Sequence, residues 1–350
     1  MLIIGCDFHT RYQQIAMLDT LTGELTERRL DHESGEAHAF YRGLPGPVRV
    51  GIEATGPIHW FERLLAELGH ELWIGDSAKI RASEVRKQKT DERDAALILE
   101  LLLSNRFPRI WVPTPAERDL RQLLWHRHKL VRMRTMLGNQ LHFLAMSQGL
   151  CRKKKLFTKI GRGELQKLHL DPWASRRREE LLRLLDQIDP AIAELDRAVL
   201  EEAKRREDAA RLMTHPGIGP VNALAFVLTI GPVSRFQRSK QVASYLGLNP
   251  SEHSTGGKRR LGAISKQGNT LVRWLLIEAA NHTSRFDPEL RQDYQRLRFR
   301  RGNAVAKVAI ARKLAVRMYW MLRSGADYAQ LVRRQGSPGA TLVNASSSLG

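Results

Sequence analysis

The chain has 350 residues, of which 42% are hydrophobic and 27% charged, so it is long enough for two folded domains. Its 57 Lys and Arg residues outnumber the 37 Asp and Glu residues, and the formal net charge of +20 indicates a nucleic-acid partner more strongly than a merely solvated basic surface. Two isolated cysteines argue against a disulfide framework and a structural zinc site. We expect no signal peptide, because the N-terminal apolar stretch is only a few residues long, and no membrane span, because no run approaches the roughly 20 apolar residues that cross a bilayer. We therefore expect a cytoplasmic, nucleoid-associated protein with no membrane partner.

Residues 1–110 alternate between strand and helix patterns. Apolar runs separated by turn residues predict strands at Leu2–Cys6, Gln13–Leu18, Leu25–Leu30, Val48–Glu53 and Glu71–Ile74. Helical periodicity predicts helices at Ile58–Leu68 and at Asp91–Leu103, the second with acidic residues in its first turn, where the helix dipole favours them. With one more helix between the third and fourth strands, the order becomes three strands, a helix, a strand, a helix, a strand and a helix. This order is typical of an RNase H-like α/β fold, which we place at residues 1–110.

Residues 111–208 are predicted to be helical and basic. The pattern is helical from Pro115 to about Met146, and the stretch Val131–Ile160 contains seven Lys or Arg residues and no Asp or Glu. A second helix, Arg176–Arg206, carries Leu at heptad-like spacing with dense charge between, which favours a coiled-coil hairpin. Plain amphipathic helices on a globular core explain the same pattern equally well.

The character of the sequence changes after Arg211, and we place a C-terminal, mainly helical domain at residues 209–325. Helices are predicted at Gln241–Leu248 and Asn269–Asn281, on either side of a Gly-rich loop. The segment His215–Ala225 is typical of a helix-hairpin-helix, in which Gly217 and Gly219 would aim backbone N–H groups at a DNA phosphate. A helix-connecting turn is the structural alternative. Residues 335–350 are rich in Ser and Gly, and we expect them to be disordered.

Four carboxylates form a candidate metal site in the N-terminal domain. Asp7 ends the first strand and Glu53 ends the fourth, while Asp91 and Asp94 lie three residues apart on one face of a helix. Strand-end carboxylates beside a helix-borne pair can hold two Mg²⁺ ions, with Mn²⁺ as an alternative, and two such ions can stabilise the attacking and leaving oxygens of a phosphoryl transfer. Turn formation or a helix N-terminal charge would explain the aspartates separately, but Glu53 lies in an apolar strand, where an unpaired carboxylate is costly.

The segment Asn249–Arg260 combines adjacent hydroxyls, two glycines and three cations. Such a loop can approach a phosphate closely, and it offers a Ser or Thr nucleophile. An ordinary Gly-rich surface turn is the alternative. The residues that would contact nucleic acid here are Gly256, Gly257, Lys258 and Arg259.

The motifs GCDFHT, GIEATGP and KTDERDA resemble the three acidic motifs of DEDD-type transposases of the IS110/IS1111 insertion-sequence family, whose catalytic domain is similar to the RuvC resolvase. The resemblance implies that Asp7, Glu53, Asp91 and Asp94 are metal ligands. Lys89 and Thr90 match the usual lead into the third motif. Phe8, His9 and Thr10 depart from the usual first motif but leave its aspartate in place.

The C-terminal region resembles the same family at Leu246–Pro250, at Ser254-Thr255-Gly256 and at Gly262–Asn269, followed by the helical Arg273. The resemblance implies that Ser254 is a nucleophile that becomes covalently linked to DNA, with Thr255 and Ser251 as competing hydroxyls. It also implies nucleic-acid contacts by Lys266 and Arg273.

These features together favour a transposase or recombinase that cuts and rejoins DNA through a serine-linked intermediate. The resemblance implies a structured guide RNA encoded by the element and a homo-oligomer, either a dimer or a tetramer. We expect that RNA on the basic stretch Arg118–Lys159, which includes Arg152, Lys153, Lys154 and Lys155. The alternatives are a RuvC-like hydrolytic nuclease, which needs only the acidic domain, and a site-specific DNA invertase.

Overall fold

The computed structural model describes residues 1–56, 58–83, 90–152, 154–253, 255 and 260–336. The chain divides into two compact units, Met1–Val112 and Pro113–Gly350, and each is described here by itself. Among the described helices, none is long and apolar enough to cross a membrane.

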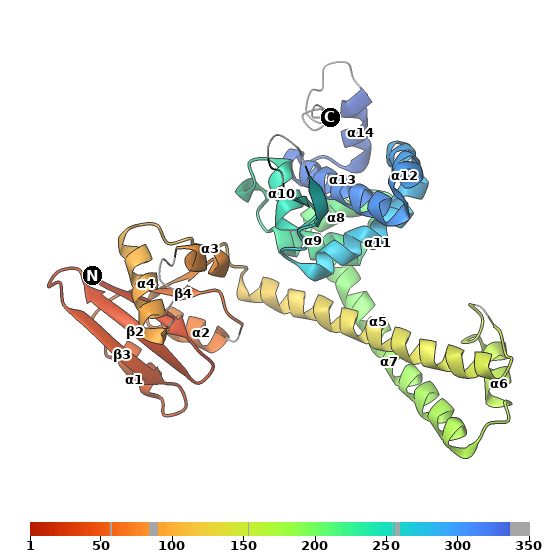
Figure 1. Ribbon diagram of the computed structural model, residues 1–350, viewed down its shortest axis with the longest axis horizontal. Coiled ribbons are helices and arrows are strands. Elements are labelled where there is room, and N and C mark those ends of the chain that lie inside the picture. The colour runs from red at the N-terminus through yellow and green to blue at the C-terminus, as the bar shows by residue number, and fades with distance from the viewer. Residues whose placement is uncertain (57, 84–89, 153, 254, 256–259, 337–350) are drawn as a thin grey trace. The chain divides into compact units, whose positions relative to one another are not determined.

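The first unit is built on a five-stranded mixed sheet (Figure 1). Its strands are β1 (Leu2–Phe8), β2 (Tyr12–Asp19), β3 (Leu25–Asp31), β4 (Arg49–Glu53) and β5 (Glu71–Gly75), in the spatial order β3-β2-β1-β4-β5. The first three strands are antiparallel, whereas β4 and β5 run parallel to β1. β1 is therefore central, and its carboxyl end lies at the same edge of the sheet as the carboxyl end of β4.

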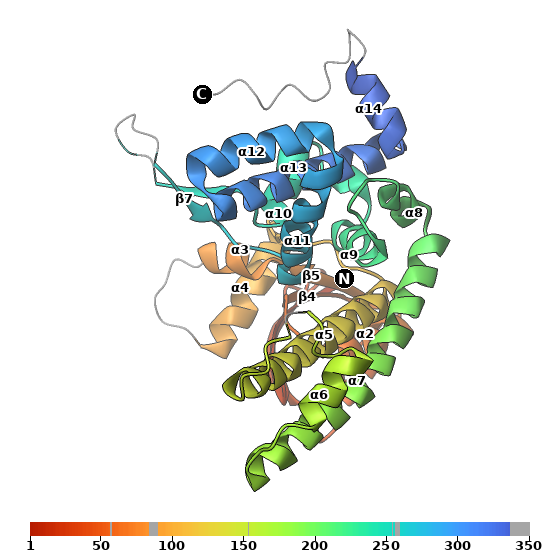
Figure 2. The same ribbon diagram turned by 90° about the vertical axis from the view of Figure 1, so that its right-hand side faces the viewer.

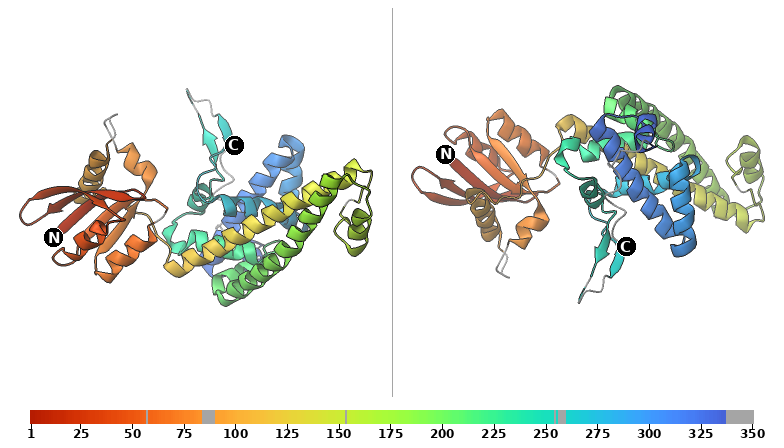
Figure 3. Two further views of the ribbon diagram at one scale, coloured as in Figure 1. Left: turned by 90° about the horizontal axis from the view of Figure 1, so that it is seen from below. Right: turned by 90° about the horizontal axis from the view of Figure 1, so that it is seen from above.

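Helices cover both faces of this sheet (Figure 3). On one face, α1 (Glu36–Arg42) and α2 (His59–Glu67) bury a core that includes Ile4, Tyr41, Ile52 and Phe61. On the other face, α4 (Asp91–Leu103) packs through Ala95, Ile98, Leu99 and Leu102. The predicted order of strands and helices is confirmed, and one further short helix, α3 (Ser77–Ala82), precedes α4.

Glycine on β1 lets α4 approach the sheet at backbone distance. A Cβ atom at Gly5 would lie 2.3 Å from the carbonyl oxygen of Ala95 and 2.4 Å from the amide nitrogen of Leu99. On β4, a Cβ at Gly51 would lie 2.7 Å from the Leu102 side chain. Side chains alternate between faces along a strand, so Asp7 and Glu53, two residues beyond these glycines, lie on the α4 face.

The second unit begins with two long helices, α5 (Pro115–Ser147) and α7 (Pro172–Arg205), which pack along each other. The short helix α6 (Lys159–Gln166) joins a small core at their far end, where Leu141, Leu144, Leu165 and Leu182 are buried (Figure 1). Arg127 pairs with Asp196 between the two long helices. The predicted pair of helices is therefore confirmed, while its coiled-coil character remains a prediction.

A helical core forms the rest of the second unit. It contains α8 (Glu207–Met213), α9 (Pro220–Ile230), η1 (Val233–Arg235), α10 (Ser239–Tyr245), α11 (Thr270–Phe286), α12 (Pro288–Arg301), α13 (Asn303–Ser324) and α14 (Tyr328–Gly336). Figure 2 shows α12 and α13 side by side, with α11 packed against both. The core also includes Leu124 of α5 and Val199 of α7, so the long helices are anchored in it. The predicted disorder of residues 335–350 falls mainly outside the described residues.

Substituting Gly5 by Ala is expected to destabilise the first unit by about 1 to 3 kcal/mol, because the new methyl group would meet helix backbone that cannot rotate away. Urea unfolding of the Gly5→Ala protein, followed by circular dichroism, measures this loss. Gly56→Ala is the matched control, since a Cβ at Gly56 meets no atom within 4 Å. Equal stability of the two variants would contradict the close approach of α4.

Candidate active site

The carboxylates of Asp7 and Asp91 meet at the carboxyl end of β1. Asp91 begins α4 one helical turn before Ala95, and Asp7 lies two residues beyond Gly5 on the strand. One turn rises about 5.4 Å and two strand residues span about 7 Å, so the packing of Ala95 on Gly5 brings the two aspartates together. One ligand atom each of Asp7, His9 and Asp91 lies within 4.8 Å of the others.

A histidine and a tyrosine from the hairpin between β1 and β2 complete this cluster. His9 Nε2 lies 3.0 Å from Asp7 Oδ2 and 3.5 Å from Asp91 Oδ2. The Tyr12 hydroxyl donates a hydrogen bond of 2.8 Å to Asp91 Oδ2. The Arg29 guanidinium lies 3.8 Å from the centre of the Tyr12 ring, so β3 also supports the site.

The electrostatics of the cluster favour a bound cation. Burial raises the pKa of Asp7, the neighbouring charges of Asp94 and Asp91 raise it further, and His9 acts in the opposite direction without reversing the shift. Ionisation of Asp7 is therefore unfavourable in this buried site beside other carboxylates, and a bound divalent cation would offset the unfavourable free energy. The donors are mainly carboxylate oxygens, as Mg²⁺ and Mn²⁺ prefer, so these residues fit the divalent metal expected from the sequence.

Glu53 reaches the same edge of the sheet but has a different partner. Cys6 pairs with Ile52 in the parallel register of β1 and β4, so Asp7 and Glu53 are the next residues on adjacent strands. The Glu53 carboxylate accepts a hydrogen bond of 3.2 Å from Arg81 of α3. Of the four predicted ligands, Asp7 and Asp91 therefore share one cluster with His9, whereas Glu53 lies at the same edge of the sheet but is engaged by an arginine. Asp94 is near enough for its charge to raise the pKa of the buried Asp7, but it is not part of that cluster.

The sequence did not assign His9, Tyr12 and Arg81 to the site. The usable signal for His9 was its place two residues after a strand-end aspartate, because the chain must turn there. Arg81 belongs to a helix of six residues, which is too short to give a clear periodic signal.

In the second unit, the predicted serine loop joins two short strands, β6 (Pro250–Glu252) and β7 (Leu261–Ile264). Ser254, Gly256, Gly257, Lys258 and Arg259 lie outside the described residues. Thr255 is exposed, and the Ser251 hydroxyl lies against Gly262, where a Cβ would come within 2.6 Å of it.

The base of this hairpin is held by close backbone contacts. Gly247 has a φ of +66°, and a Cβ there would lie 2.3 Å from the Gln267 carbonyl oxygen. Gly268 has a φ of +70°, and a Cβ there would lie 2.0 Å from the Tyr245 carbonyl oxygen. Only glycine combines this backbone conformation with so close an approach.

Arg273 and Lys266, both predicted to contact nucleic acid, occupy different environments at this base. The Arg273 guanidinium is buried and donates to the carbonyl oxygens of Leu246 at 3.1 Å and Gln267 at 2.6 Å. This arrangement accounts for Arg273 as a tie between α11 and the hairpin without any nucleic-acid ligand. Lys266 is exposed and adopts a left-handed φ of 56°.

The predicted helix-hairpin-helix turn connects α8 to α9. Gly217 has a φ of +86° and packs on α11, where a Cβ would lie 2.6 Å from Thr283 Oγ1 and 2.8 Å from the Thr283 amide nitrogen. Gly219 precedes the first residue of α9, and a Cβ there would meet no atom within 4 Å. Packing therefore explains Gly217, while phosphate binding at this turn remains a prediction.

The basic segment at the far end of the long helices is partly neutralised. Arg152 makes hydrogen bonds of 2.7 and 2.5 Å with the Glu164 carboxylate. Lys154 and Lys155 are exposed, and Lys153 lies outside the described residues.

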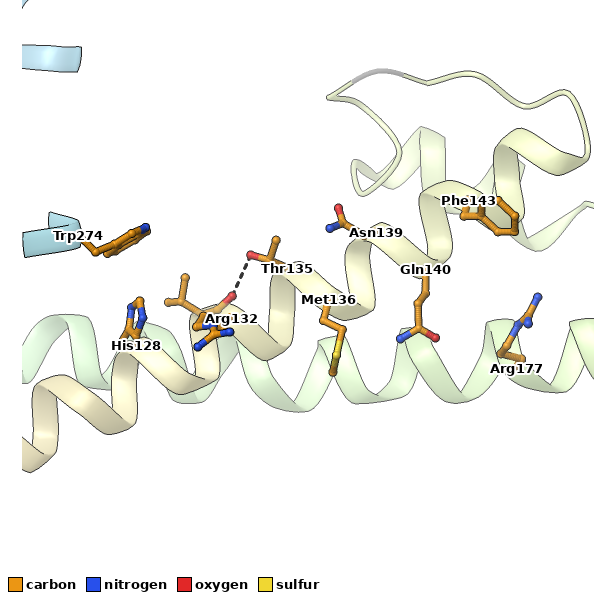
Figure 4. Close-up of a pocket in the computed structure, with 10 residues that line it drawn as sticks. His128, Arg132, Thr135, Met136, Asn139, Gln140, Phe143, Arg177 and Trp274 are labelled. Atoms are coloured by element: carbon orange, nitrogen blue, oxygen red, sulfur yellow. Dashed lines mark hydrogen bonds between the residues drawn. The ribbon is translucent and has the colours of Figure 1, made fainter. Parts of the chain in front are cut away.

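A hollow of about 620 Å³ lies along α5 (Figure 4). Aromatic rings line it, with Trp274 44% exposed and Phe143 72% exposed, and the His128 ring lies 4.8 Å from the Trp274 ring. Cations and amides complete the lining with Arg132, Arg177, Asn139 and Gln140. Exposed rings beside cations can stack unpaired bases and bind their phosphates.

Comparisons with known families point to DNA transposition. A family model described as "Transposase IS116/IS110/IS902 family" matches residues 209–295. A second model, described as "Transposase" and built on the DEDD type of IS110 elements, matches residues 4–145. A DEDD domain implies a RuvC-like α/β fold, in agreement with the mixed sheet of the first unit.

Curated relatives cover most of the chain. A "Probable family 20 transposase" of Pseudomonas aeruginosa is 32% identical over 92% of this chain and 96% of its own length. The transposase for insertion sequence element IS1111A of Coxiella burnetii is 31% identical over 93% of this chain and 91% of its own length. The transposase for element IS1328 of Yersinia enterocolitica is 29% identical over 79% and 84%, respectively.

Replacing Asp7 by Asn is expected to stabilise the metal-free protein at neutral pH. The pKa of Asp7 is raised in the folded state, so its ionisation costs stability above that pKa. Below the ordinary aspartate pKa of 3.8 the carboxyl is protonated in both the folded and the unfolded state, and the cost vanishes. The stability difference between Asp7→Asn and wild type should therefore appear as pH rises from about 3.8 through the raised pKa.

Chemical unfolding in the presence of a chelator, repeated across this pH range, measures that difference. Glu24→Gln is the control, because it removes an exposed carboxylate from the same unit. If the Asp7→Asn protein is less stable than wild type at pH 7, ionisation of Asp7 does not destabilise the folded protein and the prediction is wrong.

Proposed function

The chain belongs to the IS116/IS110/IS902 family of transposases, enzymes that cleave and rejoin DNA, and we propose that it does so by metal-assisted transesterification through a serine–DNA intermediate. The observation that carries the proposal is the meeting of Asp7 and Asp91 at the end of β1. A nuclease would need the same carboxylates, so the serine hairpin decides between the two activities.

The acidic cluster would hold divalent metal, Mg²⁺ or Mn²⁺, through Asp7, Asp91, Asp94 and Glu53. Two bound ions would stabilise the negative charge on the attacking and leaving oxygens. Glu53 must exchange its contact with Arg81 for this role, which leaves the arginine cation available to a DNA phosphate. Tyr12 keeps the Asp91 carboxylate oriented toward Asp7 through its hydrogen bond.

The serine step exchanges one phosphate ester for another. The Ser254 oxygen bonds to phosphorus and loses its proton, while one deoxyribose oxygen leaves phosphorus and gains a proton. The reverse exchange with a second DNA end rejoins the strand and frees the serine. A serine hydroxyl is weakly nucleophilic without a base or a metal ion, so the step depends on the acidic cluster. In a dimer or tetramer, the Ser254 and the acidic cluster that act on one phosphate can belong to different protomers.

We further propose that an element-encoded structured RNA binds the basic stretch Arg118–Lys159 of the second unit. The hollow along α5 supports this proposal, because Trp274 and Phe143 expose rings to unpaired bases and Arg132 adds a cation. Lys154 and Lys155 extend the positive charge toward the end of the long helices. DNA contacts are expected at the Gly219 turn and at Lys266.

Excision in cells tests both catalytic regions. The gene with its native flanking DNA should yield a circular junction, detectable by amplification, in wild type but not in Asp7→Asn or Ser254→Ala. The amount of circular junction should fall at least about 100-fold in both variants, which is the scale expected when a nucleophile or a charge-stabilising group is removed. Ser251→Ala is the matched hydroxyl control and should retain junctions.

Trapping of DNA-linked protein decides between nucleophiles. A covalent adduct in wild type and Ser251→Ala, but not in Ser254→Ala, is the expected pattern. An adduct that persists in Ser254→Ala would transfer the role to Thr255 or Ser251. Cleavage by wild type without any adduct or junction would favour the hydrolytic nuclease.

Recovery of RNA in a pulldown tests whether the basic stretch Arg118–Lys159 binds RNA. Lys153/Lys154/Lys155→Ala should recover at least about tenfold less element RNA in a pulldown at physiological salt, because three phosphate contacts are lost. Arg197/Lys204/Arg205→Ala removes equal charge from α7 and is the control. Undiminished RNA recovery by the first variant would sink this assignment.

A further inference from the structure

We infer that His9 is a nitrogen ligand of the metal centre and that it shifts the centre's preference from Mg²⁺ toward Mn²⁺. This inference rests on the proposed metal-dependent function and deepens it. It concerns a residue at which the first motif departs from the family's usual pattern.

The position of the imidazole is the first argument. His9 Nε2 lies 3.0 Å from Asp7 Oδ2 and 3.5 Å from Asp91 Oδ2, so it stands with the two carboxylates around one point. Two neighbouring ligands of an octahedral ion with bonds near 2.1 Å lie about 3 Å apart. The Asp7–His9 spacing therefore matches two donors that share one ion.

The ring is also held in this orientation. The His9 backbone N–H donates to the Tyr12 carbonyl oxygen at 2.9 Å, which closes the hairpin turn. The His9 and Tyr12 rings lie 4.7 Å apart with an interplanar angle of 30°. Tyr12 in turn lies under Arg29 and donates to Asp91. A metal ligand needs such support, because orienting contacts set both its position and its affinity.

The donor type determines the consequence. Mg²⁺ demands hard oxygen ligands and keeps several waters, whereas Mn²⁺, a larger transition-metal ion, accepts an imidazole nitrogen more readily. Replacing one oxygen ligand by His9 Nε2 therefore weakens the binding of Mg²⁺ more than the binding of Mn²⁺. The all-carboxylate set expected from the sequence would not discriminate between the two ions in this way.

Electron paramagnetic resonance of the full-length protein tests the inference. Wild type loaded with Mn²⁺ alone should show electron-spin-echo modulation from a directly bound ¹⁴N nucleus, and His9→Asn should lose it. Titration of free Mn²⁺ should show at least about tenfold weaker binding by His9→Asn, with a smaller change in Mg²⁺ competition. His126→Asn, which removes an exposed histidine from α5, should behave as wild type.

The controls separate the two levels of the proposal. Wild type with bound Mn²⁺ but no nitrogen modulation would overturn the role of His9, whatever the variants do. Unchanged Mn²⁺ affinity in His9→Asn, together with weakened binding in Asp7→Asn, would also overturn it while leaving the metal centre intact. Mn²⁺ binding that survives Asp7→Asn would instead remove the metal centre of the proposed function.

Discussion

The first unit depends on the contact between the backbone of α4 and the backbone of β1 across Gly5. Because Gly5 has no Cβ, the backbone of the helix turn at Ala95 packs directly on the backbone of the strand. Burial of Ile98, Leu99 and Leu102 stabilises this contact. Hydrophobic burial of this kind stabilises the contact by about 25 cal/mol per Å² of apolar surface removed from water. The same packing has an electrostatic consequence at the end of the helix, where burial raises the pKa of Asp7 and the neighbouring charges of Asp94 and Asp91 raise it further. The fold thus uses apolar packing to concentrate negative charge at one edge of a sheet.

The same device supports the second unit. Gly247 and Gly268 let the chain before β6 and the chain before α11 touch at backbone distance, and the buried Arg273 ties both to α11. Buried arginine is stabilised here by carbonyl oxygens, each a strong acceptor for a charged donor. A rigid base of this kind fixes where the two strands of the hairpin leave the core, while the proposed nucleophile lies beyond them.

Much of this architecture could be predicted from residue patterns, and the exceptions have physical causes. Asp7, Glu53 and Asp91 stand at ends of regular elements, where strand and helix periodicity determine both position and face. The sequence pattern predicts nucleic-acid contacts for Gly217 and Arg273, whereas the structure accounts for Gly217 by its packing on Thr283 and for Arg273 by its carbonyl acceptors. A sequence does not distinguish a glycine required for the approach of a ligand from one required for the approach of another chain segment. Arg81 could not be predicted as a site residue, because a six-residue helix has too few turns to show helical periodicity. His9 could not be predicted either, because it lies in a hairpin turn and not in a helix or strand with a periodic pattern.

The two long helices set a minimum footprint for any ligand that touches both ends of them. Leu124 of α5 lies in the C-terminal core, and Leu144 lies in the small core beside α6. At 1.5 Å per residue, the helix rises about 30 Å between them. One turn of duplex DNA spans about 34 Å, so a nucleic acid bound along this pair must be at least about one helical turn long. Short hairpins and single phosphates can therefore occupy only one end of the pair.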